Sequence, residues 1–175
     1  EFGPDGFLPD APAEKAAALA AFGMTAVGGF VPVVLHDANH DPIPELDAAL
    51  DGFVAAGAGV LVLAAATGSE GYDTRPVLDD AGWTVLLGNL ERARDLAASR
   101  GVRAVIHPHV GTMVETADDV DRVVSGSSVG FCLDTGHMFI GGTDPLTFVE
   151  QHAERVEHAH LKDVDLTIAK RVREG

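Results

Sequence analysis

The sequence predicts an α/β fold built on a parallel sheet, and within that class part of a (β/α)8 barrel. Short apolar runs alternate with longer amphipathic segments at a period of roughly 30 residues, which is the pattern of strand–helix–strand units with right-handed crossovers. Polar residues follow at least three of the apolar runs, and no run is followed by the Gly-x-Gly-x-x-Gly turn of a dinucleotide site. A barrel, which gathers its strand ends in one mouth, is therefore favoured over an open sheet.

The first half of the chain predicts two helices and two strands, after a glycine- and proline-rich loop at residues 1–10. The alanine-rich stretch 13–22 predicts a helix, and the β-branched and apolar stretch 25–35 predicts a strand. Residues 44–56 predict a second helix, which proline and glutamate open and glycine closes. Residues 60–65 are continuously apolar, as in a strand buried on both faces.

The second half begins with a long polar loop, residues 69–82, of the kind that covers active sites in many enzymes. Leucines at helical spacing predict a helix over 83–100, and Thr116 is expected to cap a helix whose first turn is acidic. The remaining expectations are strands at 103–109, 129–133 and 156–160, a glycine-containing loop after His137, and helices at 146–152 and 166–173.

The number of strands indicates an incomplete barrel. We count about five strands in 175 residues, with the end of a sixth at Glu1. A closed eight-stranded barrel takes on the order of 250 residues. We therefore expect residues 1–175 to form a single barrel domain that lacks strands at both ends.

The composition argues against two classes of partner. With 12 basic and 27 acidic residues the formal charge is −15, so a phosphate backbone is repelled and no nucleic acid partner is expected. No apolar run approaches the roughly 20 residues that span a bilayer, so no membrane partner is expected. The single cysteine, Cys132, falls inside an expected strand, which fits a buried side chain and a reducing cytoplasm. A homo-oligomer stays open.

Histidine is the most informative residue type in this sequence. Six of the eight histidines lie at or just beyond expected strand ends, namely His36, His107, His109, His137, His158 and His160. Because residues i and i+2 of a strand point to the same side, the pair at 107 and 109 shares one face, as does the pair at 158 and 160. The alternative is that the inner histidine of each pair is packed in the core. The nearby Asp134 favours a site instead.

Imidazole and carboxylate groups together suit a divalent metal ion such as zinc, manganese, iron or cobalt. Asp134 is the first ligand candidate, because a carboxylate that ends a buried strand is costly unless it is paired or bound to metal. The alternative is that Asp134 caps the following turn. His160 is the second candidate. For the third we favour His107, with His109 as the alternative, over Glu115, which falls well beyond the strand.

Other polar residues near the strand ends are candidates for contacts with a substrate. Lys162 either binds substrate oxygens or forms a solvated ion pair with Asp163. His36, which lies just beyond an expected strand, is also taken as a substrate contact.

Three motifs resemble those of a known superfamily. They are Ile106-His-Pro-His-Val-Gly-Thr-Met-Val-Glu115, Leu133-Asp-Thr-Gly-His137 with Gly141-Gly-Thr-Asp-Pro145, and His158-Ala-His-Leu-Lys-Asp-Val164. In this order they resemble the xylose isomerase-like TIM-barrel superfamily of sugar phosphate isomerases and epimerases, and most of all its inosose dehydratase branch. The resemblance runs from Glu1, at the end of the second barrel strand, to the helix after the seventh.

The resemblance implies a divalent metal ion, Mn, Co, Zn, Mg or Fe, held by side chains from barrel strands five to eight. Asp134 matches the ligand of the sixth strand and His160 that of the seventh. The fifth strand usually supplies a glutamate, whereas this chain has His107 there with His109 beside it. The glutamate of the eighth strand has no counterpart before Gly175. His137 matches a residue that contacts substrate oxygens in related isomerases.

The chemistry that the resemblance implies is proton abstraction beside a ketone that is bound to the metal ion. Our leading hypothesis is a lyase that dehydrates 2-keto-myo-inositol. His137, or the histidine that is not bound to the metal, His109 when His107 is the ligand, is the catalytic acid/base. The alternative within the superfamily is isomerisation or epimerisation of a keto-sugar or sugar phosphate. An endonuclease IV-like repair enzyme is disfavoured by the acidic charge, and a non-catalytic sugar-binding relic would bind no metal.

Overall fold

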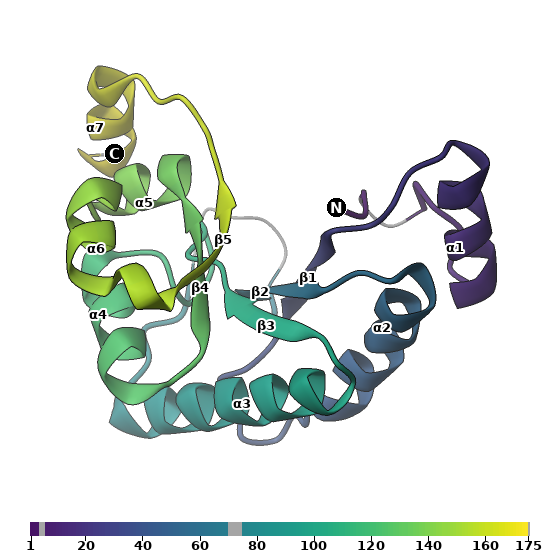
Figure 1. Ribbon diagram of the computed structural model, residues 1–175. Helices are drawn as coiled ribbons and strands as arrows, with labels where there is room; N and C mark the ends of the chain where they lie inside the picture. Colours follow the sequence, from purple (N-terminus) through teal and green to yellow (C-terminus); the bar gives the residue numbers. More distant parts are fainter. Residues whose placement is uncertain (4–5, 70–74, 175) are drawn as a thin grey trace.

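The computed structural model describes residues 1–3, 6–69 and 75–174. Its centre is a sheet of five parallel strands that lie side by side in sequence order (Figure 1). The strands are β1 (Gly28–Val33), β2 (Val60–Ala65), β3 (Arg103–Ile106), β4 (Gly130–Asp134) and β5 (Val156–His160). The parallel α/β architecture expected from the sequence is therefore confirmed.

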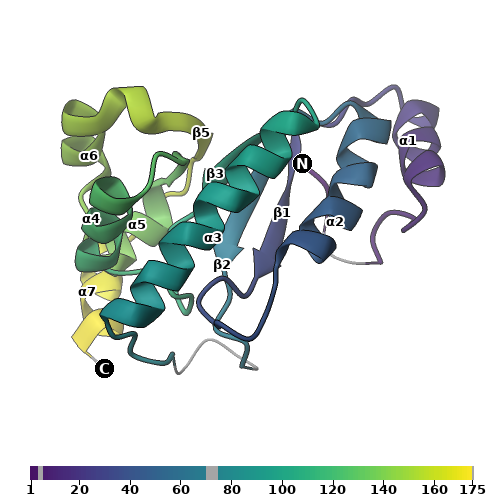
Figure 2. The same cartoon turned by 90° about the horizontal axis from the view of Figure 1, so that it is seen from below.

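Helices connect each strand to the next, with one further helix before β1 and one after β5, and they lie along the outer side of the curved sheet (Figures 1 and 2). They are α1 (Pro12–Ala21), α2 (Ile43–Ala56), α3 (Asp80–Ser99), α4 (Ala117–Gly126), α5 (Thr135–Gly141), α6 (Pro145–His152) and α7 (Leu166–Glu174), with a short 3-10 turn, η1, at Ala153–Arg155. Helix α1 packs on α2, and α7 packs on α5. None of the helices within the described ranges is long and apolar enough to cross a membrane.

Alternate residues of each strand face opposite sides of the sheet, and this alternation divides the core in two. The side chains of Leu61, Leu63 and Ile106 are fully buried in the main core between the sheet and the helices. Val62, Val105 and Cys132 form a smaller buried cluster. Because i and i+2 share a face, the strand positions that follow Val105 and Cys132 by two, occupied by His107 and Asp134, lie on the side of the smaller cluster.

One loop that we expected from the sequence is a helix. We predicted a loop after His137, but residues 135–141 form α5, which begins directly at the end of β4. The side chain of Asp134 caps it, and Gly142 ends it in the left-handed conformation at φ 94°. A Cβ atom on Gly141 would lie 2.0 Å from the carbonyl oxygen of Glu115, so glycine is required where α5 meets that segment.

Smaller differences concern element boundaries. The expected strands at 25–35 and 103–109 are shorter, since β1 spans Gly28–Val33 and β3 ends at Ile106. Helix α3 starts at Asp80, because Asp79 caps it through a hydrogen bond to Gly82 N–H, so residues 80–82 belong to the helix and not to the polar loop. The centre of that loop, residues 70–74, lies outside the described residues.

Thr116 caps helix α4, as expected from the sequence, and the structure adds that the cap is a reciprocal capping box. Thr116 Oγ1 accepts a hydrogen bond from Asp119 N–H at 3.3 Å, and Asp119 Oδ2 accepts one from Thr116 N–H at 2.8 Å. Arg75 donates to the same Asp119 oxygen at 2.6 Å, which ties the end of the polar loop to the start of α4.

The capping box gives a stability prediction. Thr116→Ala removes the acceptor of the Asp119 N–H group. This group lies in the first turn of α4, where N–H groups have no carbonyl partner within the helix, so the free energy of unfolding should fall by about 1 kcal/mol. The matched control is Thr84→Ala in α3, where an exposed threonine hydroxyl donates to the Asp80 carbonyl one turn earlier, and the change should stay within about 0.5 kcal/mol. Urea denaturation of both variants measures the difference. Equal losses would show that the box does not anchor α4.

Candidate functional site

The strand register brings Asp134 and His160 side by side. These two residues are direct neighbours across the β4–β5 pairing. His107 follows β3, and its backbone N–H continues the ladder to β2 by donating to the Leu63 carbonyl at 2.8 Å. All three residues therefore stand at the carboxyl ends of their strands, where parallel α/β folds place their chemistry.

Three ligand-type atoms of these residues converge on one point. Asp134 Oδ2 lies 3.0 Å from His107 Nε2 and 3.4 Å from His160 Nδ1. The two histidine nitrogens are 3.2 Å apart. With bonds of about 2.1 Å to a common ion, neighbouring ligand atoms would lie about 3.0 Å apart in an octahedron and about 3.4 Å apart in a tetrahedron. The spacing of the three atoms therefore matches the edges of a coordination shell.

The two oxygens of Asp134 have separate partners. Oδ1 accepts hydrogen bonds from the N–H groups of Gly136 and His137 at 3.0 and 2.9 Å, which is the cap of α5. Oδ2 faces His107, His160 and the ammonium group of Lys162. Capping and ligand geometry, which the sequence presented as alternatives, are thus compatible in one side chain.

Asp134 is ionised although it is completely buried. Burial alone would raise the pKa of this carboxyl, but hydrogen bonds from His107, from the His137 backbone and from Lys162 outweigh it and hold the pKa far below its ordinary range. Lys162 therefore pairs with Asp134, and not with Asp163 as we had considered. Two hydrogen bonds of 2.8 Å between Thr135 Oγ1 and the Lys162 backbone anchor this lysine. A positive charge already lies against the oxygen that would face a metal ion.

The peptide groups of Val110 determine which nitrogen of two neighbouring histidines carries the proton. Val110 N–H donates to His137 Nδ1 at 3.2 Å, so His137 carries its proton on Nε2. The Val110 carbonyl lies 2.7 Å from His109 Nδ1, so that nitrogen must be the protonated one in His109. The two rings are tilted by 33° to each other, with their centroids 3.7 Å apart. The geometry leaves Nε2 as a donor in His137 and as an acceptor in a neutral His109.

Burial keeps these imidazoles neutral. It lowers the pKa of His137 to about 3, with the neighbouring His109 adding to the effect. Burial likewise lowers the pKa of His107, against the opposing influence of Asp134, and the pKa of His109, against the Val110 carbonyl. Neutral imidazoles are the form that binds metal ions and accepts protons. The second ring nitrogen of His107, Nδ1, is buried and has no hydrogen-bond partner among the described residues.

Glu1 and His158 extend the cluster and were not assigned a role from the sequence. Glu1 Oε1 lies 2.5 Å from His158 Nε2 and 2.7 Å from His160 Nε2. Burial would raise the pKa of the Glu1 carboxyl, but the hydrogen bonds from these two histidines hold it below its ordinary value. The shared face of residues 158 and 160 was visible in the sequence. The contact of Glu1 with these histidines could not be seen in the sequence, because only the tertiary fold brings Glu1 close to β5.

Two candidate residues lie outside the convergent cluster. The Glu115 carboxylate accepts a hydrogen bond from Gly111 N–H at 2.9 Å and so supports the turn after β3. His36 follows β1 and lines a separate hollow of about 560 Å³. That hollow shares Thr67 with a cleft of about 250 Å³ that His109 lines, so His36 is at the same end of the sheet.

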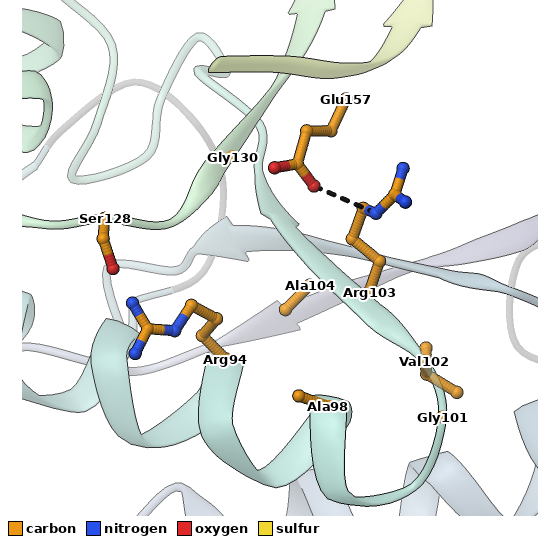
Figure 3. Close-up of a pocket in the computed structure, with 9 residues that line it drawn as sticks. All are labelled: Arg94, Ala98, Gly101, Val102, Arg103, Ala104, Ser128, Gly130 and Glu157. Carbon is orange, nitrogen blue, oxygen red and sulfur yellow. Dashed lines mark ion pairs between the residues drawn. The ribbon is translucent and has the colours of Figure 1, made fainter. Parts of the chain in front are cut away.

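A cavity of about 330 Å³ lies at the opposite end of the strands, near the first residues of β3 and β4 (Figure 3). The Arg103 guanidinium on its wall pairs with Glu157 at 3.0 Å, and Arg94 pairs with Glu91 at 2.5 Å. Its basic groups are therefore neutralised by neighbouring carboxylates. This cavity lacks the convergent ligand atoms of the histidine cluster.

Comparisons with known proteins find one family model and several curated proteins that are similar to this chain. A family model described as "Xylose isomerase-like TIM barrel" matches residues 8–174. An inosose dehydratase from Geobacillus thermodenitrificans (strain NG80-2) is 38% identical over 106 residues, or 59% of this chain and 36% of that protein. The match therefore spans about a third of the length of this curated relative.

Solved structures of low sequence identity share the fold. The 3-keto-D-glucoside 4-epimerase YcjR from E. coli has a TM-score of 0.69 at 18% identity, covering 93% of this chain and 73% of that one. The IolI protein, solved with a bound zinc atom, has a TM-score of 0.68 at 15% identity, covering 86% of this chain and 57% of that one. The partial TIM barrel expected from the sequence is confirmed.

The lowered histidine pKa values predict how stability depends on pH. The His137 ring has a pKa of about 3 in the folded chain and about 6.5 when unfolded. Below about pH 6.5 the unfolded state therefore binds a proton that the folded state does not. The free energy of unfolding should therefore decrease as the pH is lowered below about 6.5. This group contributes at most about 1.4 kcal/mol per pH unit, and less where solvent reaches the ring.

Urea denaturation in chelator between about pH 7.5 and pH 4.5 measures this slope. His137→Gln should flatten it, whatever the variant does to stability at neutral pH. A variant with the slope of the unmodified chain would rule out His137 as a contributor.

Proposed function

The chain belongs to the xylose isomerase-like TIM-barrel family, and on that premise we propose that its histidine–aspartate cluster binds a divalent metal ion in a lyase that dehydrates 2-keto-myo-inositol. The observation that carries the proposal is the convergence of Asp134 Oδ2, His107 Nε2 and His160 Nδ1 within 3.4 Å of one another. The substrate comes from the curated relatives named inosose dehydratase.

The donor set fits a metal ion. One ionised carboxylate oxygen and two imidazole nitrogens suit zinc, manganese, iron or cobalt. The Lys162 ammonium at Asp134 Oδ2 indicates that this point already favours positive charge. When bound, the ion would stabilise the negative charge that develops on substrate oxygens as a neighbouring carbon loses its proton.

The protonation of the two neighbouring histidines, His109 and His137, supports separate roles for them. His109 Nε2, an acceptor, is the base that removes the proton from the carbon beside the ketone. His137 Nε2–H donates a hydrogen bond to a substrate oxygen and stays neutral while doing so. With an ion in its place at Asp134 Oδ2, Lys162 would offer its positive charge to a further substrate oxygen. His36, in the adjoining hollow, contacts the far side of the substrate.

The proposed reaction needs no co-reactant. The electron pair of the broken C–H bond forms a double bond to the next carbon, and the hydroxyl group on that carbon leaves with the electrons of its C–O bond. His109 passes the captured proton to the departing hydroxyl, so water is released and the ring is neutral again. The resulting enol rearranges to a diketone.

Asp134 offers a test of metal binding with a matched control. Asp134→Asn keeps an oxygen that can cap α5 but removes the charged ligand, so metal affinity should fall more than about 100-fold. Asp144 caps α6 through Leu146 N–H at 2.9 Å, and Asp144→Asn should leave affinity unchanged. Calorimetric titration with zinc and manganese measures both. Equal affinities for the two variants would contradict the proposal.

Turnover tests the reaction. Purified protein supplied with metal and 2-keto-myo-inositol should release a diketone that absorbs in the ultraviolet, and His109→Gln should lower kcat by about 10²- to 10⁴-fold. An epimerase or isomerase of the same family would instead return the proton to carbon and give an isomeric ketone without that absorbance. Such a product would replace the dehydratase assignment.

A further inference from the structure

Glu1 contacts two imidazoles through a single oxygen and lies beside the candidate metal ligands. Its Oε1 atom is 2.7 Å from His160 Nε2, while the other nitrogen of that ring, Nδ1, faces Asp134 Oδ2 at 3.4 Å. We propose that Glu1 is a positioning residue that holds the proton of His160 on Nε2 and so directs the Nδ1 lone pair toward the metal position. The inference rests on the proposed metal site and adds a residue that orients it.

The count of donors and acceptors supports this placement of the proton. An ionised carboxylate only accepts hydrogen bonds, so His158 and His160 must both donate to Glu1 from Nε2. Asp134 Oδ2 already has His107 Nε2 at 3.0 Å and the Lys162 ammonium as partners. A neutral His160 carries a single ring proton. This proton therefore lies on Nε2, the nitrogen that makes the shorter contact, with Glu1.

The alternative is that Glu1, His158 and His160 hold an ion of their own, since their ligand atoms also lie close together. The distances argue against it. Oε1 is 2.5 and 2.7 Å from the two Nε2 atoms, which are hydrogen-bond lengths and shorter than the edge of about 3.0 Å around an ion with 2.1 Å bonds. The three atoms at Asp134 lie 3.0 to 3.4 Å apart instead.

The backbone explains how Glu1 reaches this position. Phe2 N–H donates to the Gly28 carbonyl at 2.9 Å, at the first residue of β1. The Phe2 ring packs edge-on against Phe53 of α2 at 5.0 Å. Residue 2 is therefore anchored beside β1, at one edge of the sheet, and residue 1 bonds to β5, at the other edge. A histidine ligand whose second nitrogen donates to a carboxylate is oriented and made more basic.

The protonation state can be observed without any metal. Nitrogen-15 spectra of the metal-free protein at about pH 8, with His160→Gln to assign the signals, should show His160 protonated on Nε2 and unprotonated on Nδ1. Glu1→Ala should convert this into a mixture of the two neutral forms. A proton on Nδ1 in the unmodified protein, or no change in Glu1→Ala, would overturn the inference.

Metal affinity gives the second measurement. Glu1→Ala should weaken zinc binding about 10- to 100-fold, and Glu1→Gln, which keeps an acceptor oxygen without its charge, should lose less. The control is Glu157→Ala, which removes the neighbouring carboxylate of β5 that pairs with Arg103 in the distant cavity (Figure 3) and should leave affinity unchanged.

The two proposals fail in different ways. No zinc binding by the unmodified protein would overturn the metal site itself. One ion bound with equal affinity before and after Glu1→Ala would overturn only the role of Glu1. Two ions per chain, with one lost in Glu1→Ala, would replace the positioning role by a second ion site.

Discussion

The site depends on keeping a charged carboxylate in the interior. Asp134 has no exposed surface, and an ionised carboxylate in such a place costs several kcal/mol unless its oxygens are fully satisfied. The start of α5 satisfies one oxygen, and His107, His160 and Lys162 surround the other. A short helix, three strand ends and one lysine are therefore arranged around a single carboxylate.

The parallel sheet supplies this arrangement through its register. Val62 pairs with Val105, and Asp134 pairs with His160, across neighbouring strands. The small buried cluster of Val62, Val105 and Cys132 forms the floor beneath the polar groups on the same face of the sheet. An apolar floor under a polar mouth lowers the local dielectric constant and strengthens each electrostatic contact above it. It also explains why burial lowers the pKa of the neighbouring histidines.

Strand register does not decide which ring nitrogen of each histidine carries the proton. Contacts with backbone groups and with one carboxylate decide it. The two peptide groups of Val110 give His109 and His137 opposite proton positions. The Glu1 carboxylate, reached through the anchored backbone of Phe2, does the same for His160. The direction in which each ring offers a proton or a lone pair thus follows from contacts between segments far apart in the chain.

The sequence by itself determined the parallel α/β class, the partial barrel, the capped start of α4 and the gathering of Asp134 and His160 with one imidazole of the pair at 107 and 109. These follow from local periodicity: apolar runs define strands, the period of two defines their faces, and a parallel sheet puts carboxyl ends together. Tertiary structure alone decided that a helix follows β4, that Lys162 pairs with Asp134, and that Glu1 reaches His160. Each of these depends on which distant groups meet, and hydrogen bonds between distant segments leave no local pattern in a sequence.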